Sequence, residues 1–172
     1  MDELNRKTVE EFKAAEKIPV TIVLDNIRSM HNVGSVFRSA DAFLVEKIIL
    51  CGFSPRPPHR DIHKTALGAT ETVEWSYNEN IIEAVRELKQ NNHRIYAVEQ
   101  AEKSIALNRF LPDNDKKLAV IFGNEVDGVN ASLLSLTDGC IEIPQFGMKH
   151  SLNVSVAAGI VLWEIFKFYR ND

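Results

Sequence analysis

Short apolar runs and segments with a helical apolar pattern alternate along this chain of 172 residues. The runs predict buried strands, and apolar residues at spacings of three and four predict helices. Strands that alternate with helices indicate an α/β fold, a mostly parallel sheet with helices on both faces. We expect strands at Val20–Leu24, Lys47–Cys51, Thr72–Trp75, Arg94–Val98, Lys117–Phe122 and Cys140–Ile143. We expect helices at Glu3–Glu16, Val33–Phe43, Asp61–Ala69, Asn80–Asn91 and Ala131–Leu136, and a last helix after Asn153.

Three polar loops follow predicted strands, at Asp25–Asn32, Gly123–Asn130 and Pro144–Ser151. Ligands of open α/β sheets bind beyond the carboxyl ends of the strands. We therefore expect one site built from these three loops. The pattern by itself predicts a doubly wound sheet without crossing connections, because threaded chains are rare. Neither G-x-G-x-x-G nor G-x-x-x-x-G-K-[ST] occurs, so the usual dinucleotide and phosphate fingerprints are absent.

The last of these loops contains the most chemistry. Pro144 ends a strand, because proline cannot donate to a ladder. Ser151 and Asn153 then precede a long apolar helix. Backbone N–H groups and short polar side chains at a helix start can hold a ligand. The alternative is a plain turn with a Ser or Asn N-cap.

Composition limits the classes of function. The formal charge of -4 gives no global basic field, so a polyanion would have to meet a local basic patch. The two cysteines, Cys51 and Cys140, occur in apolar runs and are expected as buried free thiols of a reducing compartment. The polar N-terminus is unlike a secretory signal, and Glu164 and Lys167 interrupt the most apolar helix. We expect a soluble cytoplasmic protein.

Four motifs stand in order along the chain. They are N-V-G-S-V-F-R-S-A at Asn32–Ala40, H-K-T-A-L-G-A at His63–Ala69, F-G-N-E-V-D-G-V at Phe122–Val129 and I-P-Q-F-G-M-K-H-S-L-N-V-S-V-A at Ile143–Ala157. They resemble those of the SpoU family, RNA ribose 2′-O-methyltransferases of the SPOUT superfamily, and the resemblance covers nearly the whole chain from Val20 onward. Two positions depart from the family pattern, because Gln145 stands where Met is usual and Leu44 where Gly is common.

The resemblance implies a single SpoU-type methyltransferase domain over residues 1–172, with residues 1–17 as a short N-terminal helical extension. It also implies a deep C-terminal trefoil knot whose loops hold S-adenosylmethionine. Similar proteins are homodimers in which the partner chain completes each site. The C-terminal helix is then expected at the interface, because it is apolar on more than one face. Its large apolar residues are Trp163, Ile165, Phe166, Phe168 and Tyr169.

The resemblance also assigns roles to residues. Arg38 matches the catalytic arginine, as a base or as an electrostatic clamp on a phosphate and on the developing alkoxide. The clamp is physically easier, because guanidinium stays protonated. Asn32 either positions Arg38 or the ribose, or is only the N-cap of its helix. The implied catalytic residues are Asn32, Arg38, Glu125, Ser151 and Asn153. The implied cofactor-binding residues are Val98, Glu99, Gly123, Asn124, Glu125, Ile143, Pro144, Ser151, Leu152 and Asn153.

Basic side chains on loops around the expected site are candidates for RNA contact. His59 and His63 have the spacing of a metal pair, but the sequence offers no evident third ligand, and we expect no metal. A phosphate-facing surface is the favoured interpretation. The candidates are Arg28, Arg56, Arg60, Lys64 and Lys149, with His59, His63 and His150 beside them.

The leading hypothesis is S-adenosylmethionine-dependent 2′-O-methylation of a ribose in structured RNA, with tRNA favoured over rRNA. A non-catalytic knotted RNA-binding or assembly protein is the alternative. A different nucleotide-binding α/β enzyme is a third reading, which the absent phosphate fingerprints oppose.

Overall fold

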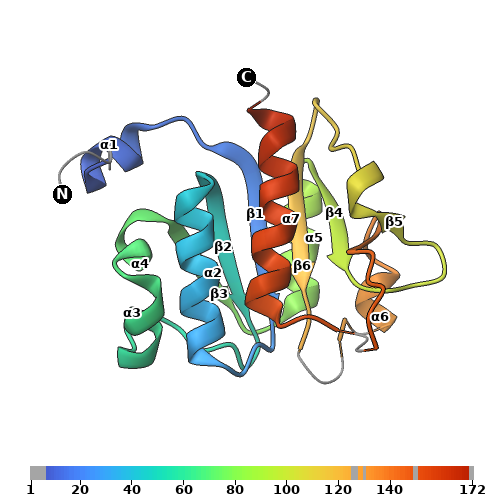
Figure 1. Cartoon of the computed structure of the whole chain (residues 1–172), viewed down its shortest axis with the longest axis horizontal. Helices are drawn as coiled ribbons and strands as arrows, with labels where there is room; N and C mark the ends of the chain where they lie inside the picture. The colour runs from blue at the N-terminus through green and yellow to red at the C-terminus, as the bar shows by residue number, and fades with distance from the viewer. Residues whose placement is uncertain (1–6, 125–127, 130, 149–150, 171–172) are drawn as a thin grey trace.

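The computed structural model describes residues 7–124, 128–129, 131–148 and 151–170. Within them one sheet has the strand order β3-β2-β1-β6-β4-β7-β5, and every neighbouring pair is parallel (Figure 1). The predicted parallel sheet is therefore confirmed. Its strands are β1 (Ile18–Asp25), β2 (Val45–Cys51), β3 (Glu74–Asn78), β4 (His93–Val98), β5 (Ile105–Ala106), β6 (Lys117–Phe122) and β7 (Gly139–Glu142).

Helices cover both faces of this sheet. In Figure 1, α2 and α7 lie side by side in front of the strands and α5 lies behind them. Residues of β1 show the division, because Ile22 and Leu24 pack in the core with α2 and α7, whereas Val23 packs in the core with α5. The helices are α1 (Val9–Ala14), α2 (Met30–Ala42), α3 (Arg60–Ala66), α4 (Ala69–Thr72), α5 (Ile81–Gln90), α6 (Ala131–Leu134) and α7 (Val154–Tyr169), with the 3-10 turn η1 (Leu107–Arg109).

The helix expected at Asp61–Ala69 is two helices, α3 and α4. Leu67 and Gly68 lie between them with φ of 49° and 92°, and this left-handed backbone ends α3. The strand expected at Thr72–Trp75 begins later, at Glu74. Thr72 instead closes α4, where its hydroxyl donates to Asp41 and to the Ala69 carbonyl.

The first helix is shorter than expected. Thr8 and Glu11 form a capping box that starts α1 at Val9. α1 ends at Ala14, and Ala15 is already extended. The expected start at Glu3 lies outside the described residues.

Leu44, which departs from the family pattern, has a φ of 52°. A left-handed backbone costs a non-glycine residue about 1–2 kcal/mol. The side chain of Leu44 packs against the main core, and this burial offsets part of the strain.

Both cysteines are buried free thiols. Burial, with a smaller effect of the Asp25 carboxylate, raises the pKa of Cys51 to about 12. Burial, with a smaller effect of Glu99, also raises the pKa of Cys140. In the part of the chain that the structure describes, no helix is long and apolar enough to cross a membrane.

Candidate functional site

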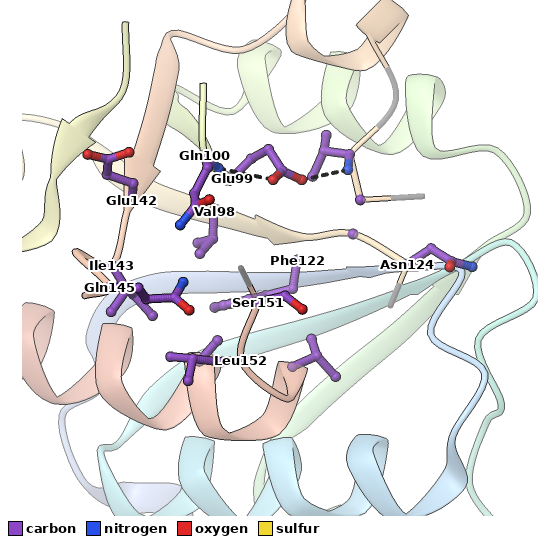
Figure 2. Close-up of a pocket in the computed structure, with 15 residues that line it drawn as sticks. Val98, Glu99, Gln100, Phe122, Asn124, Glu142, Ile143, Gln145, Ser151 and Leu152 are labelled. Atoms are coloured by element: carbon purple, nitrogen blue, oxygen red, sulfur yellow. Dashed lines mark hydrogen bonds between the residues drawn. The ribbon is translucent and has the colours of Figure 1, made fainter. Parts of the chain in front are cut away.

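A cavity of about 410 Å³ lies at the carboxyl ends of β4, β6 and β7. The chain segments that leave these strands form its walls, together with the start of α7 (Figure 2). The expected cofactor residues that line it are Val98, Glu99, Gly123, Asn124, Ile143, Ser151 and Leu152. Gln145, one of the two departures from the family pattern and expected at the wall of the cofactor pocket, also lines it. Sequence reasoning did not assign its other lining residues Gln100, Phe122, Gly128, Val129, Glu142, Val154 and Ala157, most of which adjoin an assigned residue.

Glu99 holds two walls of the cavity together. One carboxylate oxygen accepts from the backbone N–H of Val129 at 3.1 Å, and the other accepts from that of Gln100 at 3.0 Å (Figure 2). Gly128 has a φ of 65°, and a Cβ added there would overlap the Glu99 carboxylate. The glycine is thus required for this close approach. The structure gives Glu99 a positioning contact that the sequence did not predict.

Asn124 connects the cavity to the loop after β1. Its Nδ2 donates to the carbonyl of Asn26 at 3.1 Å, and Figure 2 draws it at the side of the cavity near the ends of β1 and β2. Asn26 itself donates to the buried carboxylate of Asp25 at 2.9 Å. Burial raises the pKa of Asp25.

The last residue of the first expected loop meets the start of α7 through a pair of asparagines. Nδ2 of Asn153 donates to Oδ1 of Asn32 at 3.1 Å. Asn153 is the N-cap of α7, where its Oδ1 accepts from the backbone N–H groups of Ser155 at 2.9 Å and Val156 at 3.4 Å. Ser151 lies just before this cap and lines the cavity.

The prediction that Asn32 caps its helix was wrong. α2 begins at Met30, and Oγ of Ser29 accepts from the backbone N–H of Asn32 at 3.2 Å. Asn32 lies in the first turn of the helix, so its amide is not used for capping and contacts Asn153 instead.

Arg38 lies farther along α2 and does not line the cavity. The six residues from Asn32 to Arg38 correspond to about 9 Å along the helix axis. The Arg38 side chain is exposed. Pro144 and Asn153 adjoin lining residues without lining the cavity themselves. Glu125 lies outside the described residues.

The basic candidates for RNA contact are exposed where the structure describes them. Arg28 follows β1, Arg56 follows β2 with its guanidinium 4.1 Å from the centre of the Tyr77 ring, and Arg60 begins α3. Lys64 forms an ion pair of 2.7 Å with Asp61. Lys149 and His150 lie outside the described residues.

His59 has a structural contact. Its Nδ1 accepts from the backbone N–H of Asp61 at 3.2 Å and caps α3, while His63 is exposed in the last turn. No group of three or more His, Cys, Asp or Glu that could hold a metal is found among the described residues.

Relatives with named activities are similar to this chain in sequence. The chain is 33% identical over 162 residues to the tRNA (guanosine(18)-2′-O)-methyltransferase of Thermus thermophilus. The aligned region covers 94% of this chain and 81% of that protein. It is 35% identical over 146 residues to the 23S rRNA (guanosine-2′-O-)-methyltransferase RlmB of Neisseria meningitidis, over 85% of this chain and 57% of that protein.

Solved structures share the fold. The A. aeolicus TrmH/SpoU tRNA modifying enzyme superposes with a TM-score of 0.82 at 26% identity, over 95% of this chain and 81% of that one. An AdoMet-bound rRNA methyltransferase from Sinorhizobium meliloti has the same fold, with a TM-score of 0.82 at 24% identity, over 95% of this chain and 61% of that one. The model of the SpoU rRNA Methylase family matches residues 19–163. The chain therefore belongs to the SpoU rRNA Methylase family.

Proposed function

We propose that this protein transfers a methyl group from S-adenosylmethionine to a ribose 2′-hydroxyl of RNA. The observation that carries the proposal is the Asn153–Asn32 hydrogen bond beside the cavity. This bond joins the motif that begins at Asn32 to the motif that contains Asn153, which are far apart in the sequence. The chain that holds both motifs belongs to a methylase family. Related proteins are named as 2′-O-methyltransferases of tRNA and of 23S rRNA.

The cavity fits S-adenosylmethionine in size and chemistry. Its volume of about 410 Å³ is in the range of small-ligand pockets. Val98, Phe122 and Leu152 offer apolar surface for an adenine ring, and the carboxylates of Glu99 and Glu142 suit a cation. When bound, the cofactor supplies a methyl group on a positively charged sulfonium, which becomes a neutral thioether after transfer.

The protein's own part in the reaction is positioning and charge stabilisation. Ser151 and Asn153 offer an uncharged hydroxyl and amide to the ribose or the cofactor. Arg38 clamps a phosphate next to the target and stabilises the negative charge that develops on the 2′-oxygen. The hydroxyl proton passes to solvent, because a guanidinium offers hydrogen-bond donors and no acceptor.

The active form is a homodimer that pairs through α7. Val156, Ile160 and Trp163 are 50%, 39% and 52% exposed, and their spacing places them on one face of that helix. Phe146 and Met148 of the preceding loop are exposed as well. Such a large apolar patch is typical of an interface. Ile165, which the sequence analysis assigned to the interface, is instead 1% exposed in the core of its own chain.

The partner chain completes each site. Arg38 is exposed and lies outside the cavity of its own chain, so it is free to act at a site shared between two chains. We further expect the C-terminal part of the chain to form the trefoil knot that the family resemblance implies.

The substrate is tRNA rather than rRNA. In support, the relative that the chain matches over the larger share of its own length, 81% against 57%, is named as a tRNA methyltransferase. In the test, the purified protein is incubated with methyl-labelled S-adenosylmethionine and with either tRNA or rRNA from cells without the gene. Calorimetric binding of the cofactor and label in tRNA are expected. Binding without methyl transfer to either RNA would favour the non-catalytic alternative, and no binding would overturn the proposal.

A further inference from the structure

Phe53 lies at the edge of the sheet where the carboxyl ends of the strands meet, and the proposed reaction gives no role to its exposed side chain. Its side chain is 88% exposed, directly after β2. We propose that Phe53 is a stacking platform for an unpaired base of the RNA substrate. This inference rests on the proposed function and adds to it a residue that positions the RNA.

The backbone on both sides of Phe53 is held in place. The N–H of Phe53 donates to Oδ1 of Asn26 at 3.0 Å, and the carbonyl of Gly52 accepts from the Tyr77 hydroxyl at 3.0 Å. The next residue, Ser54, is buried and donates through Oγ to the carbonyl of Leu24 at 3.0 Å. Because the backbone of this loop is held in place, the exposed ring is already positioned for contact. Little conformational entropy is then lost when a base stacks on it.

Gly52 is needed for this geometry. Its φ is 59°, and a Cβ added there would overlap Oδ1 of Asn26, the atom that accepts from Phe53. A side chain at position 52 would therefore break the contact that fixes the ring's backbone.

The same asparagine joins the platform to the cavity. Asn26 accepts from Phe53 through its side chain and from Nδ2 of Asn124 through its carbonyl, at 3.1 Å. Asn124 lines the cavity. One residue thus separates the platform's backbone from the cavity wall, so RNA that reaches the cavity passes close to Phe53.

Cationic side chains near the platform favour RNA over an apolar partner. The guanidinium of Arg56 lies 4.1 Å from the centre of the Tyr77 ring, whose hydroxyl donates to Gly52. Arg60 begins α3 a few residues later and is exposed. Single-stranded RNA is bound by aromatic faces that stack on bases, with neighbouring cations on the phosphates. An exposed aromatic followed by two exposed arginines, in a chain of net charge -4, matches that pattern.

The experiment compares Phe53→Ala, Phe53→Leu and Phe53→Trp in methyl transfer to unfractionated tRNA from cells without the gene. For Phe53→Ala the KM for tRNA should rise about 5- to 150-fold, the loss expected when one base–aromatic stack is removed. Leucine keeps apolar bulk without a π face and should behave like alanine, whereas tryptophan should bind at least as well as the wild type. kcat and the calorimetric Kd for S-adenosylmethionine should change less than about 2-fold, because Phe53 does not line the cavity.

Two controls separate stacking from other roles. Leu111→Ala removes an apolar side chain of 76% exposure that precedes the amino end of β6, and should leave the KM unchanged. Arg56→Gln should reduce the salt dependence of tRNA binding, whereas Phe53→Ala should weaken binding without altering that dependence.

An unchanged KM in Phe53→Ala, or a leucine variant equal to the wild type, would overturn the stacking role. A monomer–dimer shift in sedimentation of Phe53→Ala would instead make this face a contact between copies of the chain. If the wild type neither binds nor methylates any RNA, the proposed function fails first and the platform fails with it.

Discussion

Asn153 has two separable tasks, and substitution by aspartate divides them. Oδ1 of Asn153 caps α7, and its Nδ2 donates to Asn32. Asn153→Ala removes both. Loss of the cap costs about 0.5–2 kcal/mol, and loss of the exposed hydrogen bond costs about 0.5–1.5 kcal/mol. The free energy of unfolding should fall by ~1–3 kcal/mol, which lowers Tm by about 2–12 °C in a chain of this length.

Asn153→Asp keeps the acceptor oxygens of the cap and adds a negative charge at a helix N-terminus, which stabilises by about 0.3–1 kcal/mol. It loses the amide donor to Asn32, at a cost of about 0.5–1.5 kcal/mol that the added charge partly offsets. The free energy of unfolding should therefore stay within about 1 kcal/mol of the wild-type value. Methyl transfer should still fall by about 10²-fold or more, because an uncharged donor beside the cavity is lost.

The assay pairs urea unfolding with single-turnover methyl transfer to tRNA, both for the two variants and for the wild type. If Asn153→Asp is as stable as the wild type and also as active, the amide has no role beyond holding the helix. If the activity of Asn153→Ala falls only in proportion to its unfolded fraction, the same conclusion follows.

Four further predictions concern other parts of the molecule. Arg38→Lys keeps the charge but loses the planar fork of the guanidinium, so turnover should fall steeply. The affinity for S-adenosylmethionine should stay within a few-fold of the wild-type value, and near-normal turnover would show that a point charge suffices. Gly34→Ala forces a Cβ into α3 and should lower the free energy of unfolding by ~1–3 kcal/mol, whereas Gly147→Ala, with open space around it, should not. Burial raises the pKa of Asp25 above its unfolded value. The stability that this carboxyl contributes is therefore present below about pH 3.9 and lost as pH rises through the folded-state pKa. In urea unfolding, the free energy of unfolding of Asp25→Asn should rise relative to that of the wild type from pH 4 to pH 7. Trp163→Glu should sediment as a monomer at micromolar concentration, and an unchanged sedimentation coefficient would exclude α7 as the dimer contact.

The sequence pattern predicted the parallel sheet because strands buried on both faces are nearly continuous apolar runs, as in β1 and β6. It also predicted that the loops after β6 and β7 lie together, since carboxyl ends of parallel strands share an edge. The loop after β1 contributes no lining residue of the cavity and touches its wall through Asn26. The sequence pattern placed the cap of α2 at Asn32, whereas Ser29 is the cap. Both residue types cap helices well, and the difference lies in backbone angles. The turn after α3 was missed for a similar reason, since Leu67 is not a residue that usually adopts a positive φ.

Contacts between distant segments were the least predictable part of the site. Glu99 was expected at the cofactor, and its bond to Val129 depends on a close approach that only Gly128 permits. Phe53 was missed altogether, because an apolar residue next to a strand is expected to be buried. Its exposure follows from the loop that Asn26 holds, which is a tertiary contact.

The most direct test of the central claim is the chemical position of the transferred methyl group. Purified protein is incubated with S-adenosylmethionine labelled in the methyl group and with tRNA from cells without the gene, and the RNA is then hydrolysed in alkali. A 2′-O-methyl group blocks cleavage of the adjacent phosphodiester, so the account predicts that the label appears in one alkali-stable dinucleotide. Label in mononucleotides, which would place the methyl group on a base, or no label in any RNA, would contradict it.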